Sequence, residues 1–329
     1  MNLKKIFRAA SRYVFDSNYR FRFNAAKGKY DSMEDEEYLK KFFLAKMGYE
    51  LNLNNPETFN EKMQWLKLNY RCSVFTQMVD KYEVRKYVSN IIGEEYIVPL
   101  IAVWNTPDDI EPDKLPSQFV LKTTHGCGGM YICRDKSTFD LNSAKKALKK
   151  TFSKNYYKYM REWPYKNVQP RVIAEQYMQN GDEIHLKVYK IFNFNGIPKI
   201  IQTIQNDKTP NESIDYFDVN WNLLDLHQNY PNSKIKVEKP KTLEKMLQLS
   251  KKCSTGLPFL RTDWYEINGK VYFSEFTFYS DAGMEPFYPK KWDKILGSWI
   301  TLPDEVDKQK DKDEYSKYCK VKKISRNEN

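Results

Sequence analysis

The chain has 329 residues, of which 41% are hydrophobic and 15% aromatic, and its formal net charge is +11. This apolar content is enough for a sizeable core in two or three domains, so wholesale disorder is excluded. The basic excess favours phosphates, anionic sugars or anionic lipid as partners, or it is simply a solvated face, and no helix-turn-helix, zinc-finger or ribonucleoprotein motif indicates nucleic acid.

The N-terminus and the cysteines bear on location. Residues 1–15 mix basic and apolar side chains but lack the uninterrupted apolar core of a secretory signal. They are expected to form an ordinary domain helix or a surface helix that rests on anionic lipid. No apolar run reaches the roughly 20 residues that span a bilayer. Five cysteines without a C-x-x-C pair favour a reducing cytoplasm.

Helices are predicted first along the chain. Residues 34–48 read as a charged helix, and Thr58 with Glu61 has the spacing of a capping box that starts the next one. The apolar positions of this second helix share one face: Phe59, Met63, Leu66 and Tyr70. A further helix is predicted over 76–91, and the proline-rich, acidic loop 105–116 marks a domain boundary.

Short strands and tight turns dominate the rest of the chain. Strands are predicted near 119–122, 131–133, 171–177, 185–195, 197–205, 261–267 and 270–278. One helix is expected to begin with Asn142 or Ser143 as its cap, and another covers 240–253. The expected divisions are an N-terminal helical or α+β domain (1–115), a small lobe (116–178), a C-terminal lobe (179–303) and a charged, disordered tail (304–329).

A lysine and a glycine-rich loop form the first candidate site. Lys122 ends a predicted strand and leads into His125-Gly126-Cys127-Gly128-Gly129 before the next strand. Glycines let backbone N–H groups approach the phosphates of a nucleotide, and the lysine can reach the same phosphates. The pattern is not a Walker A loop, and an ordinary hairpin turn is the alternative. His125 either packs and caps or acts as a general acid.

A second candidate lies at the end of the strand near 171–177. Glu175, Gln176, Tyr177 and Met178 form an extended segment that can offer backbone groups to adenine, and Glu183 follows closely. A carboxylate here can hold the adenine amino group or ribose hydroxyls. A surface strand end is the alternative.

The third candidate is a hairpin that carries two acids. Asp263 and Glu275 lie on adjacent strands and can bridge Mg²⁺, whose shell is completed by water and phosphate oxygens. A two-residue Asn268-Gly269 turn would put them on opposite faces, so we predict a three-residue loop, 267–269, with Asp263 diagonal to Glu275. Arg261 shares the face of Asp263 and can stabilise an oxyanion. A hairpin with two solvated acids is the alternative.

In chain order these pieces resemble the ATP-grasp superfamily, and most closely the TupA-like ATP-grasp family, named for teichuronopeptide synthesis. The resemblance covers about residues 45–303 and rests on many short blocks in one order. Those blocks include 58–62, 64–68, 80–85, 115–122, 125–129, 161–163, 174–175, 189–190, 194–196 and 275–278.

The resemblance implies an α+β ATP-grasp fold with mixed or antiparallel sheets and a nucleotide cleft between two lobes. ATP and Mg²⁺ are the implied cofactors. Lys122 would be the phosphate lysine, and the loop 125–129 would cover the phosphates. Glu175 would lie in the adenine hinge and Glu183 near the ribose. Asp263 and Glu275 would bind the metal, and Arg261 would face an acyl phosphate. A second phosphate contact would come from one of two lysines, Lys187 or Lys190.

Three positions depart from the family pattern. Cys127 stands where a serine is usual, Thr277 where many relatives have a metal-binding asparagine, and Val188 where an acid is common. Arg85 and Arg161 are candidates for contacting an acidic acceptor.

The resemblance implies an ATP-dependent carboxylate–amine ligase that works through an acyl phosphate in cell-surface polysaccharide biosynthesis. Its partners would be a small or sugar-linked carboxylate and an amine. The alternatives are a sugar kinase or glycosyltransferase of the same pathway, and a catalytically weak nucleotide-binding partner of a membrane assembly complex.

Overall fold

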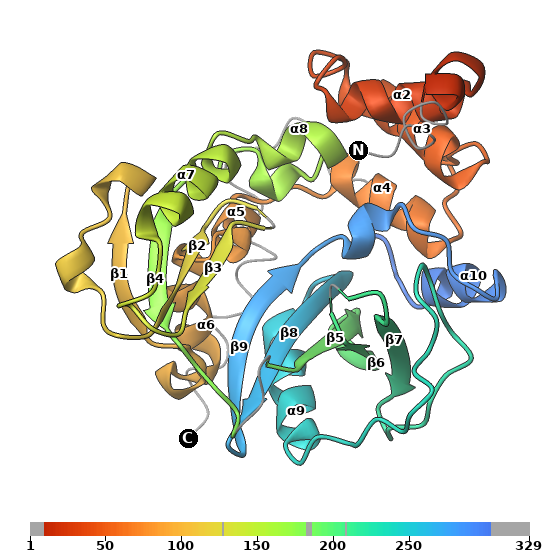
Figure 1. The fold of residues 1–329 in the computed structure, drawn as a ribbon. Helices are drawn as coiled ribbons and strands as arrows, with labels where there is room; N and C mark the ends of the chain where they lie inside the picture. The colour runs from red at the N-terminus through yellow and green to blue at the C-terminus, as the bar shows by residue number, and fades with distance from the viewer. Residues whose placement is uncertain (1–9, 127, 182–185, 208, 304–329) are drawn as a thin grey trace.

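The computed structural model describes residues 10–126, 128–181, 186–207 and 209–303. The described chain forms two antiparallel sheets covered by helices, which confirms the α+β prediction (Figure 1). Cys127, Glu183 and the predicted tail 304–329 lie outside the described residues. Within the described residues, no helix combines the length and apolar character needed to cross a membrane.

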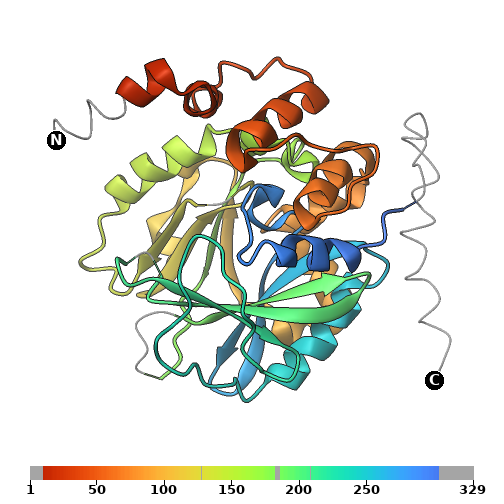
Figure 2. The ribbon, with the colours of Figure 1, turned by 90° about the vertical axis from the view of Figure 1, so that its right-hand side faces the viewer.

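Helices open the chain, and the first of them, red in Figure 2, lie above the large sheet. Their bounds are α2 (Ser17–Ala26), α3 (Asp35–Met47), α4 (Phe59–Asn69), α5 (Ser73–Val79) and α6 (Glu83–Ile92). The predicted capping box is confirmed, because the Thr58 hydroxyl accepts a hydrogen bond from the Glu61 amide and the Glu61 carboxylate accepts one from the Thr58 amide.

The single helix predicted over 76–91 is wrong. Two helices, α5 and α6, are separated by a turn at Asp80-Lys81-Tyr82. The Asp80 carboxylate accepts hydrogen bonds from the amides of Tyr82 at 2.8 Å and Glu83 at 3.4 Å. A local acid therefore ends one helix and starts the next, as such side chains do at helix N-termini.

The small sheet has four strands in the order β1-β4-β2-β3. Its strands are β1 (Leu100–Trp104), β2 (Phe119–Thr123), β3 (Met130–Cys133) and β4 (Val172–Gln176). β1 precedes the boundary expected at residue 115 and yet pairs with β4, so the sheet is not confined to 116–178.

Helix α7 (Leu141–Phe152) packs against the small sheet (Figure 2), and α8 (Tyr156–Met160) follows it. The cap of α7 is Asp140 and not Asn142 or Ser143, because the Asp140 carboxylate accepts from the Ser143 amide at 2.9 Å. A small core that includes Trp104, Leu121 and Leu148 joins the sheet to the helix.

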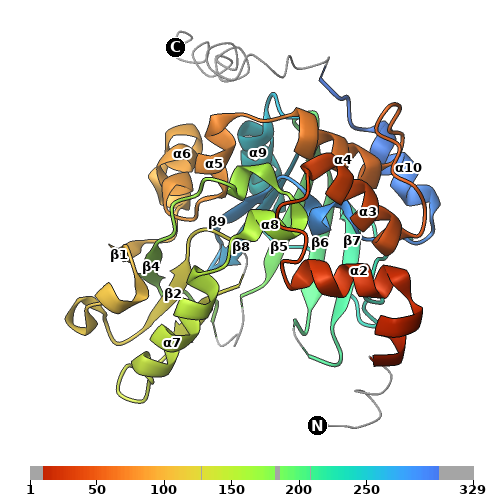
Figure 3. The same ribbon diagram turned by 90° about the horizontal axis from the view of Figure 1, so that it is seen from above.

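The large sheet has five strands in the order β7-β6-β5-β8-β9. Its strands are β5 (Val188–Phe194), β6 (Ile197–Gln205), β7 (Ser213–Asp218), β8 (Phe259–Ile267) and β9 (Lys270–Thr277). Helix α9 (Leu243–Ser254) packs against β5, β6 and β8 and beside α6, and α10 (Lys291–Ser298) packs on α4 (Figure 3). Short 3-10 turns complete the fold: η1 (Glu94–Tyr96), η2 (Pro107–Asp109), η3 (Pro112–Lys114), η4 (Trp163–Tyr165) and η5 (Ser280–Gly283).

The N-terminal helices share the main core with the large sheet. The Phe59 ring lies 5.0 Å from the Phe259 ring, and Phe75 lies 4.6 Å from Phe278. Apolar side chains of α4, α5 and α6 therefore belong to the same buried cluster as the strands β5, β8 and β9.

The β8–β9 hairpin brings Asp263 and Glu275 together as expected, but through a bulge in β9 and not through a longer turn. Ile267 pairs with Lys270, so the turn has two residues, with Asn268 and Gly269 at φ of 50° and 75°. The predicted three-residue loop is wrong. Instead, the register shifts between Asp263 and Trp264, and the extra residue is Ser274. This bulge puts Glu275 directly opposite Asp263.

Candidate functional site

A cavity of about 400 Å³ lies between the two sheets and next to the α5–α6 turn. The small sheet contributes residues of β2, β3 and β4, and the large sheet contributes residues of β5, β6, β8 and β9. Its charged lining residues are Lys81, Arg85, Lys122, Glu175, Lys190, Asp207, Asp263 and Glu275. The predicted phosphate lysine and both predicted metal acids therefore line a single space.

On the small-lobe side, Glu175 is held between two cations. Its carboxylate lies 2.6 Å from Lys122 Nζ and 2.9 Å from Arg85 Nη1. Arg85 also donates to the carbonyl of Val98. Burial acts to lower the pKa of Lys122, but the adjacent Glu175 outweighs it and the pKa is raised. Lys122 therefore stays fully charged at neutral pH, as a phosphate-binding lysine must.

On the large-lobe side, Asp263 and Glu275 flank one guanidinium. Arg261 donates from Nε and Nη2 to the two oxygens of Asp263, both at 2.8 Å, and its Nη2 lies 3.8 Å from Glu275 Oε1. Burial raises the pKa of Asp263. Burial acts in the same sense on Glu275, but Lys81 and Arg261 lower its pKa to about 2.

This donor set fits Mg²⁺. The metal takes one or two carboxylates and completes its shell with water and phosphate oxygens. Asp263 and Glu275 already share one cationic group, the Arg261 guanidinium, so the space between them suits positive charge.

The glycine-rich loop is tied to the acids by Lys81. Lys81 Nζ donates to the Gly126 carbonyl at 2.9 Å and lies 3.3 Å from Glu275 Oε2. Gly128 lines the cavity at a φ of 84°. At Gly129, with φ of 64°, an added Cβ would lie 2.7 Å from the Thr123 hydroxyl, so close packing requires glycine there.

Comparison with known proteins agrees with this geometry. The sequence profile described as TupA-like ATPgrasp matches residues 61–301. The chain belongs to the TupA-like ATP-grasp family. A search of curated proteins found no match.

Solved structures show a likeness of fold alone. D-alanine–D-alanine ligase from Helicobacter pylori shares 15% identity over 74% of this chain and 69% of its own, with a TM-score of 0.41. D-alanine–D-alanine ligase from Bacillus anthracis shares 15% identity over 80% and 71%, with a TM-score of 0.39. D-cycloserine synthetase shares 12% identity over 68% and 71%, with a TM-score of 0.38.

The structure distinguishes the two lysines that the sequence left open in this ATP-grasp protein. Lys190 pairs across the sheet with Asp263 and lines the cavity, whereas the exposed Lys187 is not among the lining residues. Burial and the neighbouring Arg261 lower the pKa of Lys190. Thr277 lies opposite Arg261, two residues beyond Glu275, and does not line the cavity.

Several other predicted residues lie outside the cavity lining. His125 is buried, and its ring packs on Phe152 at the end of α7, which favours the packing interpretation. The backbone amide of Gln176 donates to the Pro99 carbonyl, and the Tyr177 hydroxyl accepts from Arg134. Met178 is half-buried and does not line the cavity either. An adenine contact by residues 176–178 stays a prediction.

Two arginines proposed as acceptor contacts have other roles. Arg85 pairs with Glu175, as described above. Arg161 is 2% exposed, and its guanidinium donates to the carbonyls of Tyr30, Met33 and Lys158. Arg161 therefore holds the segment between the first helices, and its guanidinium is engaged by protein carbonyls.

Sequence reasoning missed Lys81 as a cavity residue. In the sequence Lys81 stands only within the family block 80–85, since its partners, Gly126 and Glu275, lie far away in the chain. The local signal is Asp80, whose carboxylate accepts from the first amides of α6 next to Lys81.

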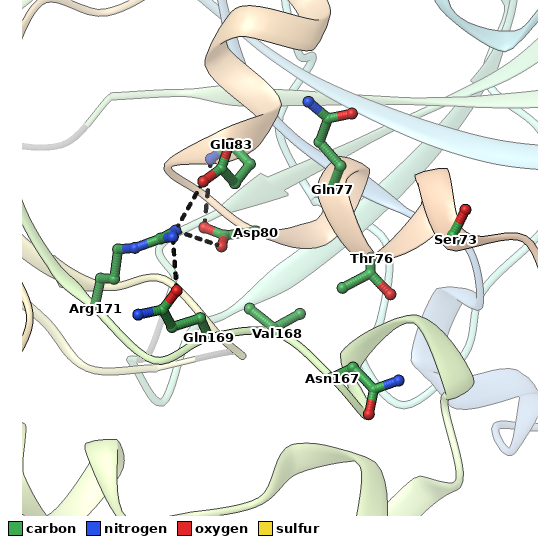
Figure 4. Close-up of a pocket in the computed structure, with 9 residues that line it drawn as sticks. All are labelled: Ser73, Thr76, Gln77, Asp80, Glu83, Asn167, Val168, Gln169 and Arg171. Atoms are coloured by element: carbon green, nitrogen blue, oxygen red, sulfur yellow. Dashed lines mark hydrogen bonds and ion pairs between the residues drawn. The ribbon is translucent and has the colours of Figure 1, made fainter.

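A second, shallower cavity of about 330 Å³ lies behind this turn (Figure 4). There Arg171, just before β4, lies 3.2 Å from Asp80 and 3.0 Å from Glu83. Figure 4 shows the two acids converging on the guanidinium. The pair fastens the small sheet to the turn that presents Lys81.

Proposed function

We propose that the protein is an ATP-dependent carboxylate–amine ligase that works through an acyl phosphate. The observation that carries the proposal is the convergence of Lys122, Lys190 and the Asp263–Glu275 pair on one cavity between two sheets. Two lysines with two acids suit a nucleotide triphosphate and its metal. Family membership supports the use of ATP.

Each side chain has a role that follows from its position. Lys122, Lys81 and Lys190 hold and orient the phosphate oxygens, and such positioning supplies most of the catalysis in phosphoryl transfer. Mg²⁺, held by Asp263 and Glu275, would neutralise the charge that develops on the phosphates. Arg261, next to both acids, can stabilise the oxyanion when an amine attacks the acyl phosphate, a contribution of about 3 kcal/mol.

We further propose that the carboxylate is a sugar acid or an amino acid and that the product belongs to cell-surface polysaccharide biosynthesis. Support comes from the family name and from the net charge of +11, which suits an anionic substrate.

Product analysis tests the ligase. The protein is incubated with Mg-ATP, uronic acids and amino acids, and ADP and free phosphate are measured. Release of both products that requires an acid together with an amine supports the proposal. ADP without free phosphate would indicate a kinase, and nucleotide binding without turnover would indicate a sensor.

Replacement of the metal acids tests the site. Asp263→Asn should lower turnover by roughly 100-fold or more, because a catalytic metal contributes several kcal/mol. Glu275→Gln serves as the second variant, because Glu275 is less buried and its loss strains the fold less. Activity close to that of the unaltered protein in both variants would show that the metal assignment is wrong.

A further inference from the structure

A carboxylate without a partner lies near Arg261. Glu162 follows α8 and is 5% exposed. Among the described residues, no donor makes a hydrogen bond or ion pair with its carboxylate, although a buried carboxylate without a partner costs several kcal/mol. Its neighbour Arg161, at a φ of 54°, is anchored through backbone carbonyls, so the backbone of Glu162 is fixed in this position.

Lys67 joins the backbone just before Glu162 to the loop η5. This fully buried lysine donates from Nζ to the Met160 carbonyl at 2.9 Å and to the Ala282 carbonyl at 2.7 Å. It also donates to the side chain of Gln64 at 3.0 Å. All three of its protons are used on neutral acceptors, so it acts on Glu162 through charge and not through contact. The segment of Glu162 and the loop η5 are thereby held together.

The loop η5 presents a second carboxylate to the same region. Asp281 is exposed at a φ of 49°, and Ala282 follows at 55°. Left-handed backbone at residues other than glycine costs about 1 kcal/mol or more each and is concentrated at functional sites. Gly283 lies so close to α4 that an added Cβ would be 2.3 Å from Met63 Cβ. The strained loop is therefore fixed against α4.

Arg261 connects the two carboxylates to the reaction site. Its Nη1 donates to the Ser280 hydroxyl at 3.3 Å, and that hydroxyl donates to Asp281 at 3.1 Å. Burial raises the pKa of Glu162 to about 7, Lys67 and Arg261 oppose the rise, and Asp281 adds to it. Since Lys67 joins the backbone beside Glu162 to η5 and Arg261 contacts Ser280 of the same loop, the segments of Glu162, Arg261 and Asp281 meet at η5.

We propose that Glu162 and Asp281 bind the ammonium group of the amine substrate beside Arg261, and that Glu162 takes its proton. The inference rests on the proposed ligase and specifies its second substrate as a primary amine that is cationic at neutral pH, such as an amino acid or an amino sugar. Asp281 attracts the ammonium from solvent, and Glu162 has no other partner to release.

The chemical step is balanced. The ammonium transfers one proton to the Glu162 carboxylate and becomes a free amine. The amine nitrogen forms a bond to the acyl carbon, the bond from that carbon to the phosphate oxygen breaks, and phosphate leaves with the electron pair. The second proton of the nitrogen leaves with the phosphate, and Glu162 returns its proton to water.

A neutral nucleophile distinguishes the proposed role of Glu162 and Asp281 in amine binding from the ligase activity itself. Hydroxylamine is uncharged at neutral pH, traps an acyl phosphate as a hydroxamate, and needs neither an acidic pocket nor a base. Wild-type protein and variants are assayed with Mg-ATP and glucuronate or galacturonate, either with hydroxylamine or with a pool of amino acids and glucosamine.

Glu162→Gln should lower kcat with the ammonium substrates by roughly 100-fold, the usual contribution of a general base, and leave hydroxamate formation within a factor of about two. Asp281→Asn should raise KM for the ammonium substrates by roughly threefold to tenfold without affecting hydroxylamine. Asp215→Asn is the matched control, since Asp215 is also buried with one unpartnered oxygen but lies on β7, and it should alter neither reaction.

Equal losses with both nucleophiles in Glu162→Gln would overturn the inference and show a structural role. Undiminished amine turnover would overturn it as well. If Glu162→Gln does not fold, Glu162→Asp, which withdraws the carboxylate by one methylene, should still depress amine turnover relative to hydroxamate formation. A wild-type protein that forms no hydroxamate would instead contradict the proposed ligase.

Discussion

At the residue scale, two acids of the central cavity, Glu175 and Glu275, are each matched by a cation from another element. Glu175 on β4 contacts Arg85 of α6, and Glu275 on β9 contacts Lys81 of the α5–α6 turn. Together with Arg261, the Lys81 cation holds the pKa of Glu275 low despite its burial. Such pairs between distant segments also explain why the predicted acids could be found from the sequence and Lys81 could not, since no local pattern records a partner 45 residues away.

The first prediction concerns Lys81. Lys81→Met should weaken Mg-ATP binding by roughly tenfold, because a cation that touches both the glycine-rich loop and Glu275 is lost. Calorimetric titration with Mg-ATP measures the change. Lys114→Met removes an exposed lysine that pairs only with Glu111 and should leave the affinity unaltered. Equal affinities in both variants would contradict a phosphate role for Lys81.

The second prediction concerns pH. The pKa of Glu162 is raised by burial from 4.5 to about 7, so its ionisation removes stability as the pH rises through that window. The other ionisable groups that face it are Lys67, Arg261, Tyr279 and Asp281. Lys67, whose pKa burial lowers to about 8, adds stability only above that pH.

Urea unfolding at pH 5 and pH 7 provides the measurement. Glu162→Gln cannot ionise, so its free energy of unfolding relative to the wild type should be higher at pH 7 than at pH 5. A difference that is the same at both values would show that Glu162 is not the titrating group.

At the element scale, the site depends on small irregularities within regular strands and helices. The bulge at Ser274 brings Glu275 opposite Asp263, and the Asp80 turn divides two helices. Hydrophobic periodicity located these elements but not their interruptions. A bulge leaves no distinct sequence signal, because a longer turn would produce the same shared face, and the helix break follows from one capping acid in an otherwise helical pattern.

The third prediction compares two neighbouring glycines of the loop. Both have positive φ, but an added Cβ meets open space at Gly128 and the Thr123 hydroxyl at Gly129. Gly128→Ala should therefore cost about 1 kcal/mol of stability, and Gly129→Ala clearly more, together with a larger loss of Mg-ATP affinity. Thermal unfolding with and without Mg-ATP measures both effects. Identical behaviour of the two variants would mean that the packing at Gly129 is not required.

At the scale of the whole molecule, family blocks in the sequence indicated the ATP-grasp fold, and the antiparallel α+β architecture confirms it. The division at residue 115 stays a prediction, because a proline-rich loop marks a surface turn as readily as a domain boundary. That loop connects β1 to β2 within one sheet, while the helices before it belong to the core of the other.

The fourth prediction concerns membranes. A peripheral contact through the N-terminal region stays a prediction, supported by the exposure of Val14 at 60% and Phe15 at 85% beside Arg12 and Arg20. Cosedimentation with vesicles rich in anionic phosphatidylglycerol should exceed that with neutral phosphatidylcholine. Phe15→Asp should reduce it, while Ile235→Asp, at another highly exposed apolar residue, should not. No preference for anionic vesicles would end this expectation.

The position of β1 has a mechanical consequence. The chain enters the small sheet just before β1 and leaves it just after β4, and these two passages touch, because the Gln176 amide donates to the Pro99 carbonyl at 2.9 Å. Because the two chain passages are joined at one point, the small sheet can rotate about that point, but its translation relative to the large sheet is restricted. If the sheets change their angle around a nucleotide, they should therefore rotate about a hinge at the Pro99–Gln176 contact, close to the Arg85–Glu175 pair.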